Sequence, residues 1–405
     1  MSTDVIVVGA GAVGLAVALR LAESGSTVTV VDADEPGRKA SWAASGSLSL
    51  ILPQAAPRPL RELAAASWDR WPDFSAQLEQ RSGMEVQLRR SGLVRLMLSE
   101  ASTTATVESR EWLAAHGHRS EWIDRDGIAE LTPAATDRVD RALYQPDVWQ
   151  LRPPRLMRAL LEAAARTERI TVAPFSPVAH LLVEGPRVRG VRLTTGADLF
   201  AQEVVVCAGA WADRLLNPIA GITMAIRPIR GQLLCLTRPS DLRPGSDAIL
   251  LGEGNHYLIP RSDGRLVAGS TFEDSGFDDR VTAGGLHEIL SGALDFAPKI
   301  TEAPIVAHWA GLRPSTPDGA PLLGRPQDVD GLVVAAGHFR DGLLLTPVTA
   351  DIVHAVINGT QPPLDLTAYA VGRPSPVAGD SPGPHTVTAS DEYSVRPSVS
   401  TSATS

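Results

Sequence analysis

The sequence predicts an α/β fold in which a Rossmann-type domain on a parallel sheet is interleaved with a second domain built on a largely antiparallel sheet. Residues 5–8 and 27–31 are short β-branched runs, and residues 12–24 between them carry apolar side chains at helical spacing, so the amino terminus is a βαβ unit. Two later apolar runs, 203–211 and 331–339, each lead into a glycine and can return to the same sheet. The second sheet is predicted from shorter apolar runs that are separated by turn residues, as in β-hairpins. These runs are residues 86–98, 229–237, 256–260 and 265–271.

The two domains are expected to alternate along the chain. The nucleotide-binding domain is predicted to comprise residues 1–50, 140–215 and 322–370, and the substrate domain residues 51–139 and 216–321. Helical spacing of apolar residues predicts helices at 60–81, 105–116, 153–167, 283–297 and 346–357. Residues 371–405 are rich in Ser, Pro, Thr and Gly and have too few large apolar side chains to offset chain entropy, so a disordered tail is predicted there.

The composition excludes several classes of function. A formal net charge of −9 argues against a nucleic-acid partner, because phosphate binding needs a basic surface. The chain has neither a run of eighteen apolar residues nor a basic leader, so no membrane contact is expected and a cytoplasmic location is predicted. Cys207 and Cys235 are too few for a disulfide framework or a zinc site. Both are expected to be buried and unreactive, and no metal site is predicted.

A glycine-rich turn follows the first predicted strand. Gly9, Gly11 and Gly14 have the spacing G-x-G-x-x-G, and Asp32 ends the second strand. In dinucleotide-binding proteins such glycines allow a tight turn, close approach of the backbone to pyrophosphate and close helix packing, while the acidic residue binds a ribose hydroxyl. The alternative is a glycine-rich turn without a ligand. FAD and NAD share this pattern, but partner strands spread as far as residue 339 favour FAD.

Four segments carry a resemblance to a known family. These are PGRKASWAASG at 36–46, YLIPR at 257–261, GLRPSTPDGAPLLG at 311–324 and GHFRDGLLLTPVTADIV at 337–353. Together, and in this order after the glycine-rich turn, they resemble the FAD-dependent glycine oxidases of the thiamine pathway, which belong to the D-amino-acid oxidase group. The likeness spans roughly residues 3 to 360 and leaves out the tail.

The resemblance implies roles at the substrate end of the site. Arg313 matches the arginine that binds the substrate carboxylate, Tyr257 a tyrosine that joins this contact, and Arg340 a second arginine beside substrate and flavin. Arginine suits two-point recognition of a carboxylate, and a guanidinium buried in apolar sequence needs an anion. The structural alternative is an ion pair with a carboxylate of the protein, such as Asp341 or Asp318, and for Tyr257 a place in the core.

The resemblance also implies cofactor contacts. Ser41 and Ala43 match a turn that passes close to the flavin, Val178 matches a residue that meets the adenine, and Gly337, Gly342 and Leu343 lie in a loop along the flavin ring. Gly209, at the end of the run 203–211, is assigned to the same site. Trp42 and Trp309 are expected to be core residues or to shape the pocket. His256 and His338 are expected to form hydrogen bonds or to be solvated, because this chemistry requires no catalytic base.

The implied activity is oxidation of glycine or a related, N-substituted, small amino acid to an imine and then a 2-oxo acid, with oxygen reduced to hydrogen peroxide. One departure from the pattern concerns the substrate: Ser47 stands where glycine oxidases commonly have methionine. Because Ser47 would make the pocket more polar or larger, an alternative function remains: a specialised biosynthetic oxidase or dehydrogenase that acts on a larger N-substituted glycine. A non-oxidase FAD-binding subunit and an NAD-dependent dehydrogenase are further alternatives. The oligomeric state is left open, a homo-oligomer included.

Overall fold

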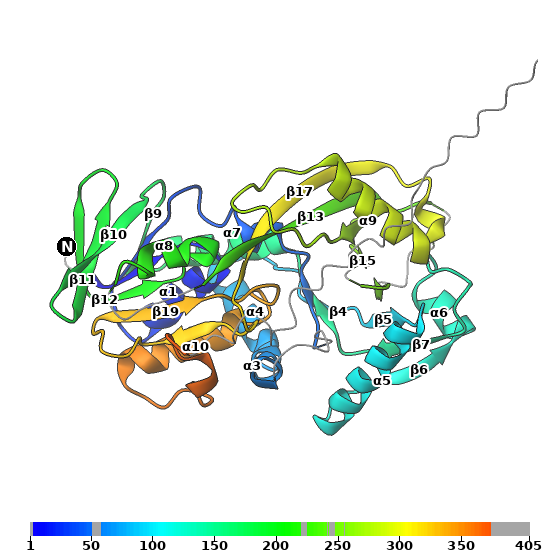
Figure 1. Ribbon diagram of the computed structural model, residues 1–405, viewed down its shortest axis with the longest axis horizontal. Helices are drawn as coiled ribbons and strands as arrows, with labels where there is room; N and C mark the ends of the chain where they lie inside the picture. The colour runs from blue at the N-terminus through cyan, green and yellow to red at the C-terminus, as the bar shows by residue number, and fades with distance from the viewer. Residues whose placement is uncertain are drawn as a thin grey trace, which may run out of the picture.

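The computed structural model describes residues 3–50, 58–219, 225–240, 242, 248–254 and 256–373. Figure 1 shows an elongated molecule with one large sheet toward each end, and the long strands β13 (Arg227–Thr237) and β17 (Ile305–Ser315) running between them. A third, small sheet contains β3 (Ser47–Leu48), β8 (Trp149–Gln150) and β4 (Arg89–Arg90). The mixed α/β architecture with two interleaved sheets agrees with the predicted fold class.

The first sheet is the Rossmann-type sheet. Its strand order is β10-β11-β12-β1-β2-β9, and β19 also pairs with β12 and carries β18 at its other edge. The pairs β1–β12, β1–β2, β2–β9 and β12–β19 are parallel. The strands are β1 (Thr3–Val8), β2 (Val28–Val31), β9 (Ile170–Ala173), β10 (Val178–Glu184), β11 (Arg187–Leu193), β12 (Asp198–Val206), β18 (Leu322–Gly324) and β19 (Leu332–Ala336). The expected return of two later strands to this sheet is therefore confirmed.

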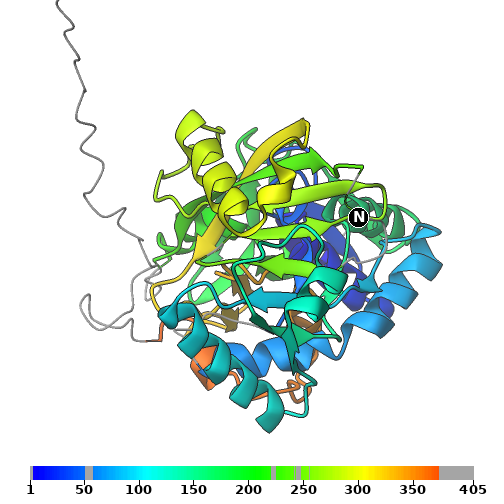
Figure 2. The ribbon, with the colours of Figure 1, turned by 90° about the vertical axis from the view of Figure 1, so that its right-hand side faces the viewer.

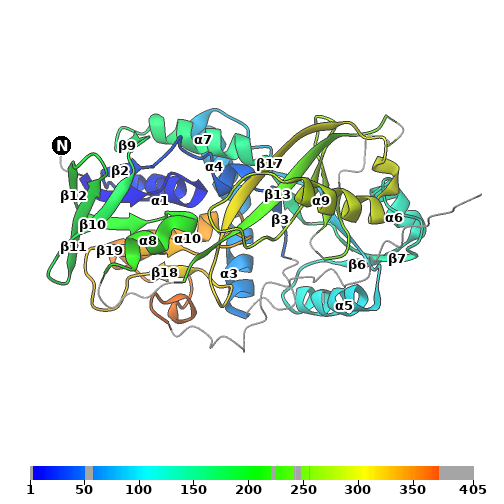
Figure 3. The same cartoon turned by 45° about the horizontal axis from the view of Figure 1, so that its top comes forward.

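Helices cover both faces of this sheet because the final residues of β1 and β12 and all of β19 are apolar and buried on both faces. One face packs on α1 (Ala12–Glu23), α7 (Pro153–Ala165) and α10 (Thr346–Asn358), whose buried residues form one core with Val5, Val7 and Val30. The opposite face packs on α8 (Ala212–Leu216) through Leu215 and Leu216. Figure 3 shows the α1 and α7 side of the sheet with the long strands β13 and β17 beside it.

The second sheet has the order β17-β13-β16-β15-β14-β5-β7-β6. All neighbouring strands are antiparallel except β5 and β14, so the prediction of a largely antiparallel sheet is confirmed. Its other strands are β5 (Leu93–Leu96), β6 (Glu121–Asp124), β7 (Arg141–Gln145), β14 (Ile249–Leu251), β15 (Tyr257–Pro260) and β16 (Arg265–Gly269). Figure 2 shows α9 (Ala283–Phe296) and α5 (Glu100–Ala115) on opposite sides of this sheet.

Several predicted boundaries need correction. The expected single helix at 60–81 is two helices, α3 (Arg58–Trp68) and α4 (Trp71–Ser82), because Pro72 in the first turn of α4 has no N–H to continue a preceding helix. Helix α5 begins at Glu100, earlier than predicted, because Ser99 and Ser102 form a capping box. The short helices α2 (Ala40–Ala43) and α6 (Arg125–Leu131) and the antiparallel ribbon β10–β11 were not predicted.

Two predicted domain limits also differ from the observed pairing. The limit at residue 140 lies too early, because β7 pairs with β5 and β6 in the second sheet. The limit at residue 371 lies slightly too early as well, since Val371 is buried and Arg373 forms an ion pair with Asp318 at 2.6 Å. Residues 374–405, the rest of the predicted tail, lie outside the described residues. Among the described helices, none has the length and apolar character to cross a bilayer.

Candidate active site

A cavity of about 700 Å³ lies between the two large sheets. This volume falls in the range of small-molecule and cofactor sites. Its lining contains every predicted site residue except Gly337: Gly9, Gly11, Gly14, Asp32, Ser41, Ala43, Val178, Gly209, Tyr257, Arg313, Arg340, Gly342 and Leu343. Gly337 instead packs against Thr316, whose methyl group would lie 2.5 Å from an added Cβ. The cavity therefore gathers residues that are more than 300 positions apart in the sequence.

The glycine-rich turn forms one end of the cavity. Gly9 has φ +107°, a conformation that side chains with a Cβ rarely adopt, and a Cβ there would lie 2.5 Å from the carbonyl oxygen of Cys207. A Cβ on Gly14 would lie 1.9 Å from the carbonyl oxygen of Gly9. The turn leads into α1 at Ala12, with Gly11 as its N-cap. The amino end of α1 therefore meets the cavity with no side chain from its own N-cap residue, as an anion-binding helix terminus requires.

Two side chains hold this turn in place. Asp32, at the end of β2, accepts hydrogen bonds from the N–H groups of Ala10 at 2.7 Å and Asp34 at 3.0 Å. Burial raises the pKa of Asp32, although these hydrogen bonds act in the opposite direction. Ser41 Oγ accepts a hydrogen bond from Ala12 N–H at 3.0 Å. The segment around Ser41 is thus tied to the start of α1.

Further contacts tie the turn at 40–46 to the second sheet. Trp309 Nε1 of β17 donates to the carbonyl oxygen of Ala43 at 2.9 Å. Arg261, whose pKa burial lowers to about 10, donates to the carbonyl oxygens of Ser45 and Leu151. The expected pocket-shaping role of Trp309 therefore has a physical basis, because it links two walls of the same cavity.

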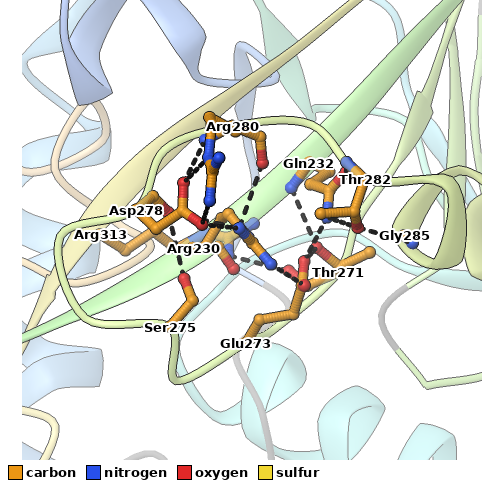
Figure 4. A network of polar contacts seen from close by, with 10 residues as sticks. All are labelled: Arg230, Gln232, Thr271, Glu273, Ser275, Asp278, Arg280, Thr282, Gly285 and Arg313. Carbon is orange, nitrogen blue, oxygen red and sulfur yellow. Dashed lines mark hydrogen bonds and ion pairs between the residues drawn. The ribbon is translucent and has the colours of Figure 1, made fainter.

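At the other end of the cavity, Arg313 lies on β17 and is half-buried. Its Nη1 donates to the carbonyl oxygen of Thr271 at 2.9 Å (Figure 4). Its Nη2 donates to Ser270 Oγ at 3.0 Å. The guanidinium lies 4.2 Å from the centre of the Phe272 ring and flat against Gly231, where a Cβ would approach within 2.2 Å. Burial lowers the pKa of Arg313 to about 10, so the side chain stays cationic at neutral pH.

The partners of Arg313 are neutral oxygen atoms. A third, longer hydrogen bond of Nη1 goes to the carbonyl oxygen of Arg230 at 3.4 Å. Of the five guanidinium N–H groups, Nε–H and one Nη2–H therefore remain for an anion. The alternative of a structural ion pair with Asp318 is wrong, because Asp318 pairs with Arg373. Within the described ranges, Arg313 forms no ion pair with a carboxylate.

Tyr257 is the first residue of β15 and is half-buried, so it is not a core tyrosine. Its hydroxyl packs over Gly269, where a Cβ would lie 2.7 Å from it. Arg313 donates to Ser270, the residue after Gly269, so the Tyr257 hydroxyl and the Arg313 guanidinium contact adjacent residues of the chain. The cavity wall thus presents a hydroxyl beside a guanidinium.

Arg340 differs from the expectation of a buried guanidinium. Its side chain is exposed to the cavity, 5.4 Å from the centre of the Phe272 ring, whereas Leu343 and Leu344 after it are buried. Asp341 lies next to it, and burial raises the pKa of this carboxyl group while the charge of Arg340 lowers it. Both Arg313 and Arg340 therefore face Phe272 from the same cavity.

These observations place a glycine-rich turn at the start of α1 and two arginines, Arg313 and Arg340, in one cavity. The family described as FAD dependent oxidoreductase matches residues 4–355 of the chain. The chain belongs to this family. It is 32% identical to a glycine oxidase of Pseudomonas putida over 370 residues, which cover 91% of this chain and 98% of that protein.

Solved structures of this FAD-dependent oxidoreductase family are similar as well. The crystal structure of glycine oxidase from Geobacillus kaustophilus has a TM-score of 0.86 at 30% identity, with 92% of this chain and 99% of that chain covered. The crystal structure of iminodiacetate oxidase from Chelativorans sp. BNC1 has a TM-score of 0.82 at 26% identity, with 91% and 99% covered. The resemblance to glycine oxidases read from the sequence is thereby confirmed.

FAD is the cofactor of this oxidoreductase, and the turn fits it. Gly9 and Gly14 leave room where a side chain would collide with backbone, which lets the pyrophosphate approach the amino end of α1. Val178 and Gly209 line the same end of the cavity, and Gly342 and Leu343 line it from the loop before α10. The individual cofactor contacts of these residues stay predictions.

The two histidines differ in their position relative to the cavity. His338 is buried, its Nε2 lies 3.1 Å from Thr349 Oγ1, and burial lowers its pKa to about 4, so it is neutral at pH 7. His256 packs under Gly292, away from the cavity lining, and its pKa is also lowered by burial. Cys207 and Cys235 are buried and unpaired, as expected, and burial raises the pKa of Cys207 to about 12.

Sequence reasoning missed the side chains that surround the two arginines. Ser270, Thr271 and Phe272 follow β16 directly and supply two hydrogen-bond acceptors and the ring over which both guanidinium groups lie. Arg95 of β5 was missed too; burial, and then the charge of Arg340, lowers its pKa. Ser270 and Thr271 were the last residues of the predicted strand 265–271 and Phe272 followed it, but nothing in their local pattern indicated that Arg313, more than forty positions later, would contact them.

Proposed function

We propose that this FAD-dependent oxidoreductase is an amine oxidase that converts glycine or a small N-substituted glycine into the corresponding imine. A hydride leaves the α-carbon and a proton leaves the nitrogen, so the amine loses two electrons and two protons, which reduce oxygen to hydrogen peroxide. The imine is then hydrolysed to a 2-oxo acid and the amine or ammonia. The observation that carries the proposal is that the partners of Arg313 are neutral acceptors. A cationic guanidinium that lines a cavity and bonds only to neutral acceptors calls for an anionic ligand.

The chain's own residues would bind and orient the substrate. The Nε–H and Nη2–H groups of Arg313 would bind the carboxylate, and the hydroxyl of Tyr257 would donate to one of its oxygen atoms. This clamp would fix the α-carbon at one distance from the wall formed by the loop 337–343, which reduces the entropic cost of reaching the reactive geometry. When bound, FAD supplies the chemistry of accepting a hydride from the carbon next to nitrogen.

The cationic character of this end also favours loss of a proton from the substrate. A bound ammonium group near Arg340 and Arg313 would have a lowered pKa, because like charges disfavour the charged form. The neutral amine is the form that can be oxidised. No side chain needs to act as a general base, which agrees with a His338 that is already hydrogen bonded to Thr349.

One observation favours an N-substituted glycine as the substrate. Ser47 lines the cavity, and its side chain is smaller and more polar than the methionine that glycine oxidases commonly have there. The similarity to iminodiacetate oxidase supports the same reading, because iminodiacetate is a glycine with a carboxymethyl group on nitrogen. A pocket widened at this wall would admit such a group while the clamp at Arg313 stays the same.

A substrate panel tests the proposal. The purified FAD-bound protein would be incubated with glycine, sarcosine, D-alanine and iminodiacetate, and peroxide formation and flavin bleaching without oxygen would be measured. We expect peroxide with glycine or one of the N-substituted glycines. Bleaching without peroxide would instead indicate a dehydrogenase with another electron acceptor. If none of the four bleaches the flavin, the alternative of a non-oxidase FAD-binding subunit is favoured and the proposal fails.

A further inference from the structure

We infer that Glu273 is a positioning residue for substrate recognition, because it fixes the acceptors that hold the guanidinium of Arg313. This inference rests on the proposed role of Arg313 as the carboxylate-binding group. It concerns the segment 270–282, which connects β16 to α9 and contributes Ser270 and Phe272 to the cavity lining. Figure 4 shows the polar network of this segment, with Arg313 at its edge.

Glu273 is the centre of the network. Its carboxylate accepts hydrogen bonds from Arg230 Nη2 at 2.5 Å, Thr271 Oγ1 at 2.5 Å and Gln232 Nε2 at 2.6 Å. Burial opposes ionisation, but these three donors prevail and lower the pKa of Glu273. Arg230 is only 6% exposed and Gln232 is fully buried, so the donors belong to the rigid interior of β13. The carboxylate is therefore held by the sheet and not by solvent.

Two of the three partners of Glu273 also bear acceptors of Arg313. Thr271 donates to Glu273 through its hydroxyl and accepts from Arg313 Nη1 through its carbonyl oxygen at 2.9 Å. Arg230 donates to Glu273 through its guanidinium, and its carbonyl oxygen accepts from both Glu273 N–H at 3.0 Å and Arg313 Nη1 at 3.4 Å. The Arg313 guanidinium is thus held by Ser270 Oγ and by two carbonyl groups, and both carbonyl groups belong to residues that bond to Glu273.

The same network closes the far end of the segment. Gln232 Oε1 accepts from Thr282 N–H at 2.9 Å, and Thr282 caps α9 by accepting from Gly285 N–H at 3.1 Å. Gly285 leaves room for this contact, since a Cβ there would lie 2.1 Å from Gln232 Nε2. Both ends of the segment are therefore anchored to β13. Glu273 bonds directly to Thr271, at the end that carries the acceptors of Arg313, and it is connected to Thr282 at the far end only through Gln232.

The outer part of the network offers a matched control. Arg280 pairs with Asp278 at 2.8 Å, and its side chain is 83% exposed. This pair belongs to the same segment and has the same charge types, but its side chains do not bond to Thr271. Exposed pairs of this kind contribute little to stability. Removing Arg280 therefore tests whether any charge change in the segment affects recognition.

The experiment uses the FAD-bound full-length protein and its Glu273→Gln, Thr271→Val and Arg280→Ala variants. Acetate, a carboxylate without an amine, serves as the probe, and its dissociation constant is measured from the change in flavin absorbance. We expect Glu273→Gln and Thr271→Val to weaken acetate binding and to raise the KM of the best amine about tenfold, with kcat changed less than about twofold. Arg280→Ala should match the wild type.

A Glu273→Gln protein that is folded, retains FAD and keeps wild-type acetate binding and KM would overturn the inference. If that variant does not fold, Thr271→Val decides the matter, because valine preserves the shape and the backbone carbonyl of threonine. A loss of thermal stability alone, with unchanged acetate binding, would also overturn it. Should the wild type form no peroxide with any amine while acetate binding still depends on Glu273, the proposed function fails and the positioning role stands.

Discussion

The two ends of the cavity differ in whether backbone atoms or side chains determine their shape. At the glycine-rich turn the shape is set by backbone atoms, because Gly9 and Gly14 bring carbonyl groups and the start of α1 into contact. At the Arg313 end the shape is set by side chains and carbonyl groups from β13, β17 and the segment after β16. The glycine-rich turn comes from one continuous stretch, Gly9 to Gly14, whereas the groups around Arg313 come from segments distant in sequence.

This difference teaches which parts of such a site tolerate change. A site shaped by backbone atoms loses its binding geometry when one Cβ is added, because backbone atoms cannot relieve the collision by adopting another rotamer. A site shaped by side chains loses affinity in steps, because each hydrogen bond contributes only a limited part of the binding free energy. We therefore expect substitutions at the turn to abolish cofactor binding and substitutions at the other end to leave the cofactor in place.

The largest effect is expected for Gly14→Val. A Cβ at this position would lie 1.9 Å from the carbonyl oxygen of Gly9, so the turn and α1 cannot keep their contact. The purified protein should contain no flavin, as measured by the absorbance ratio of flavin to protein. Gly284→Ala is the control, because nothing lies within 4 Å of a Cβ at that position. If the Gly14→Val protein kept the flavin content of the wild type, the expectation that the turn tolerates no added Cβ would be wrong.

The next effect is expected for Arg313→Ala. Loss of the guanidinium leaves a substrate carboxylate without its partner, so kcat/KM should fall by about 3 kcal/mol, or roughly 150-fold. Flavin content should stay at the wild-type level, which separates this end from the turn. Arg325→Ala removes an arginine that pairs with Glu203 outside the cavity lining, and it should leave kcat/KM unchanged. Wild-type kinetics in Arg313→Ala would refute the clamp.

A smaller effect is expected for Tyr257→Phe, which removes one hydroxyl and keeps the ring. The lost hydrogen bond should raise KM about tenfold, corresponding to about 1.4 kcal/mol, with little change in kcat. Steady-state kinetics with the best amine of the panel measures it. A change confined to kcat would mean that the hydroxyl acts on the reacting atoms instead of on the carboxylate.

The smallest effect concerns the pH dependence of stability and involves His338, which lines the cavity. Burial lowers the pKa of His338 from 6.5 to about 4. Between these values the unfolded chain binds a proton that the folded protein does not, so the free energy of unfolding decreases as pH falls. From this group alone the decrease is about 1 kcal/mol between pH 6.5 and 5.5. Urea unfolding of wild type and His338→Gln at both pH values should show this difference, and parallel pH dependences would contradict it.

The sequence predicted the turn far better than the substrate end. The spacing of Gly9, Gly11 and Gly14 after a β-branched run has a local physical meaning, so it could be read without tertiary information. Arg313 and Tyr257 were identified through a resemblance, and the structure places both at the cavity. Their partners could not be predicted, because hydrogen bonds to Thr271 and Ser270 depend on how β13, β16 and β17 pair.

The wrong predictions also arose because local sequence patterns do not show how distant segments pack together. Arg340 was expected to be buried because apolar residues follow it, but burial depends on which wall of the cavity the loop forms. The domain limit at residue 140 was placed before β7, because a short apolar run does not reveal to which sheet it belongs. Local patterns therefore predicted elements reliably, whereas assignment of side chains to a shared site required the fold.

The parallel pairing of β12 with β19 has a consequence for biosynthesis. As the protein emerges from the ribosome, β1, β2, β9 and β12 are available after about half of synthesis, but the edge of β12 stays open until residue 336 has left the exit tunnel. Helix α10, which packs on α1, follows only after that. Nascent chains must therefore carry an unpaired strand edge through the second half of translation, a state that exposes them to misassociation and chaperone capture.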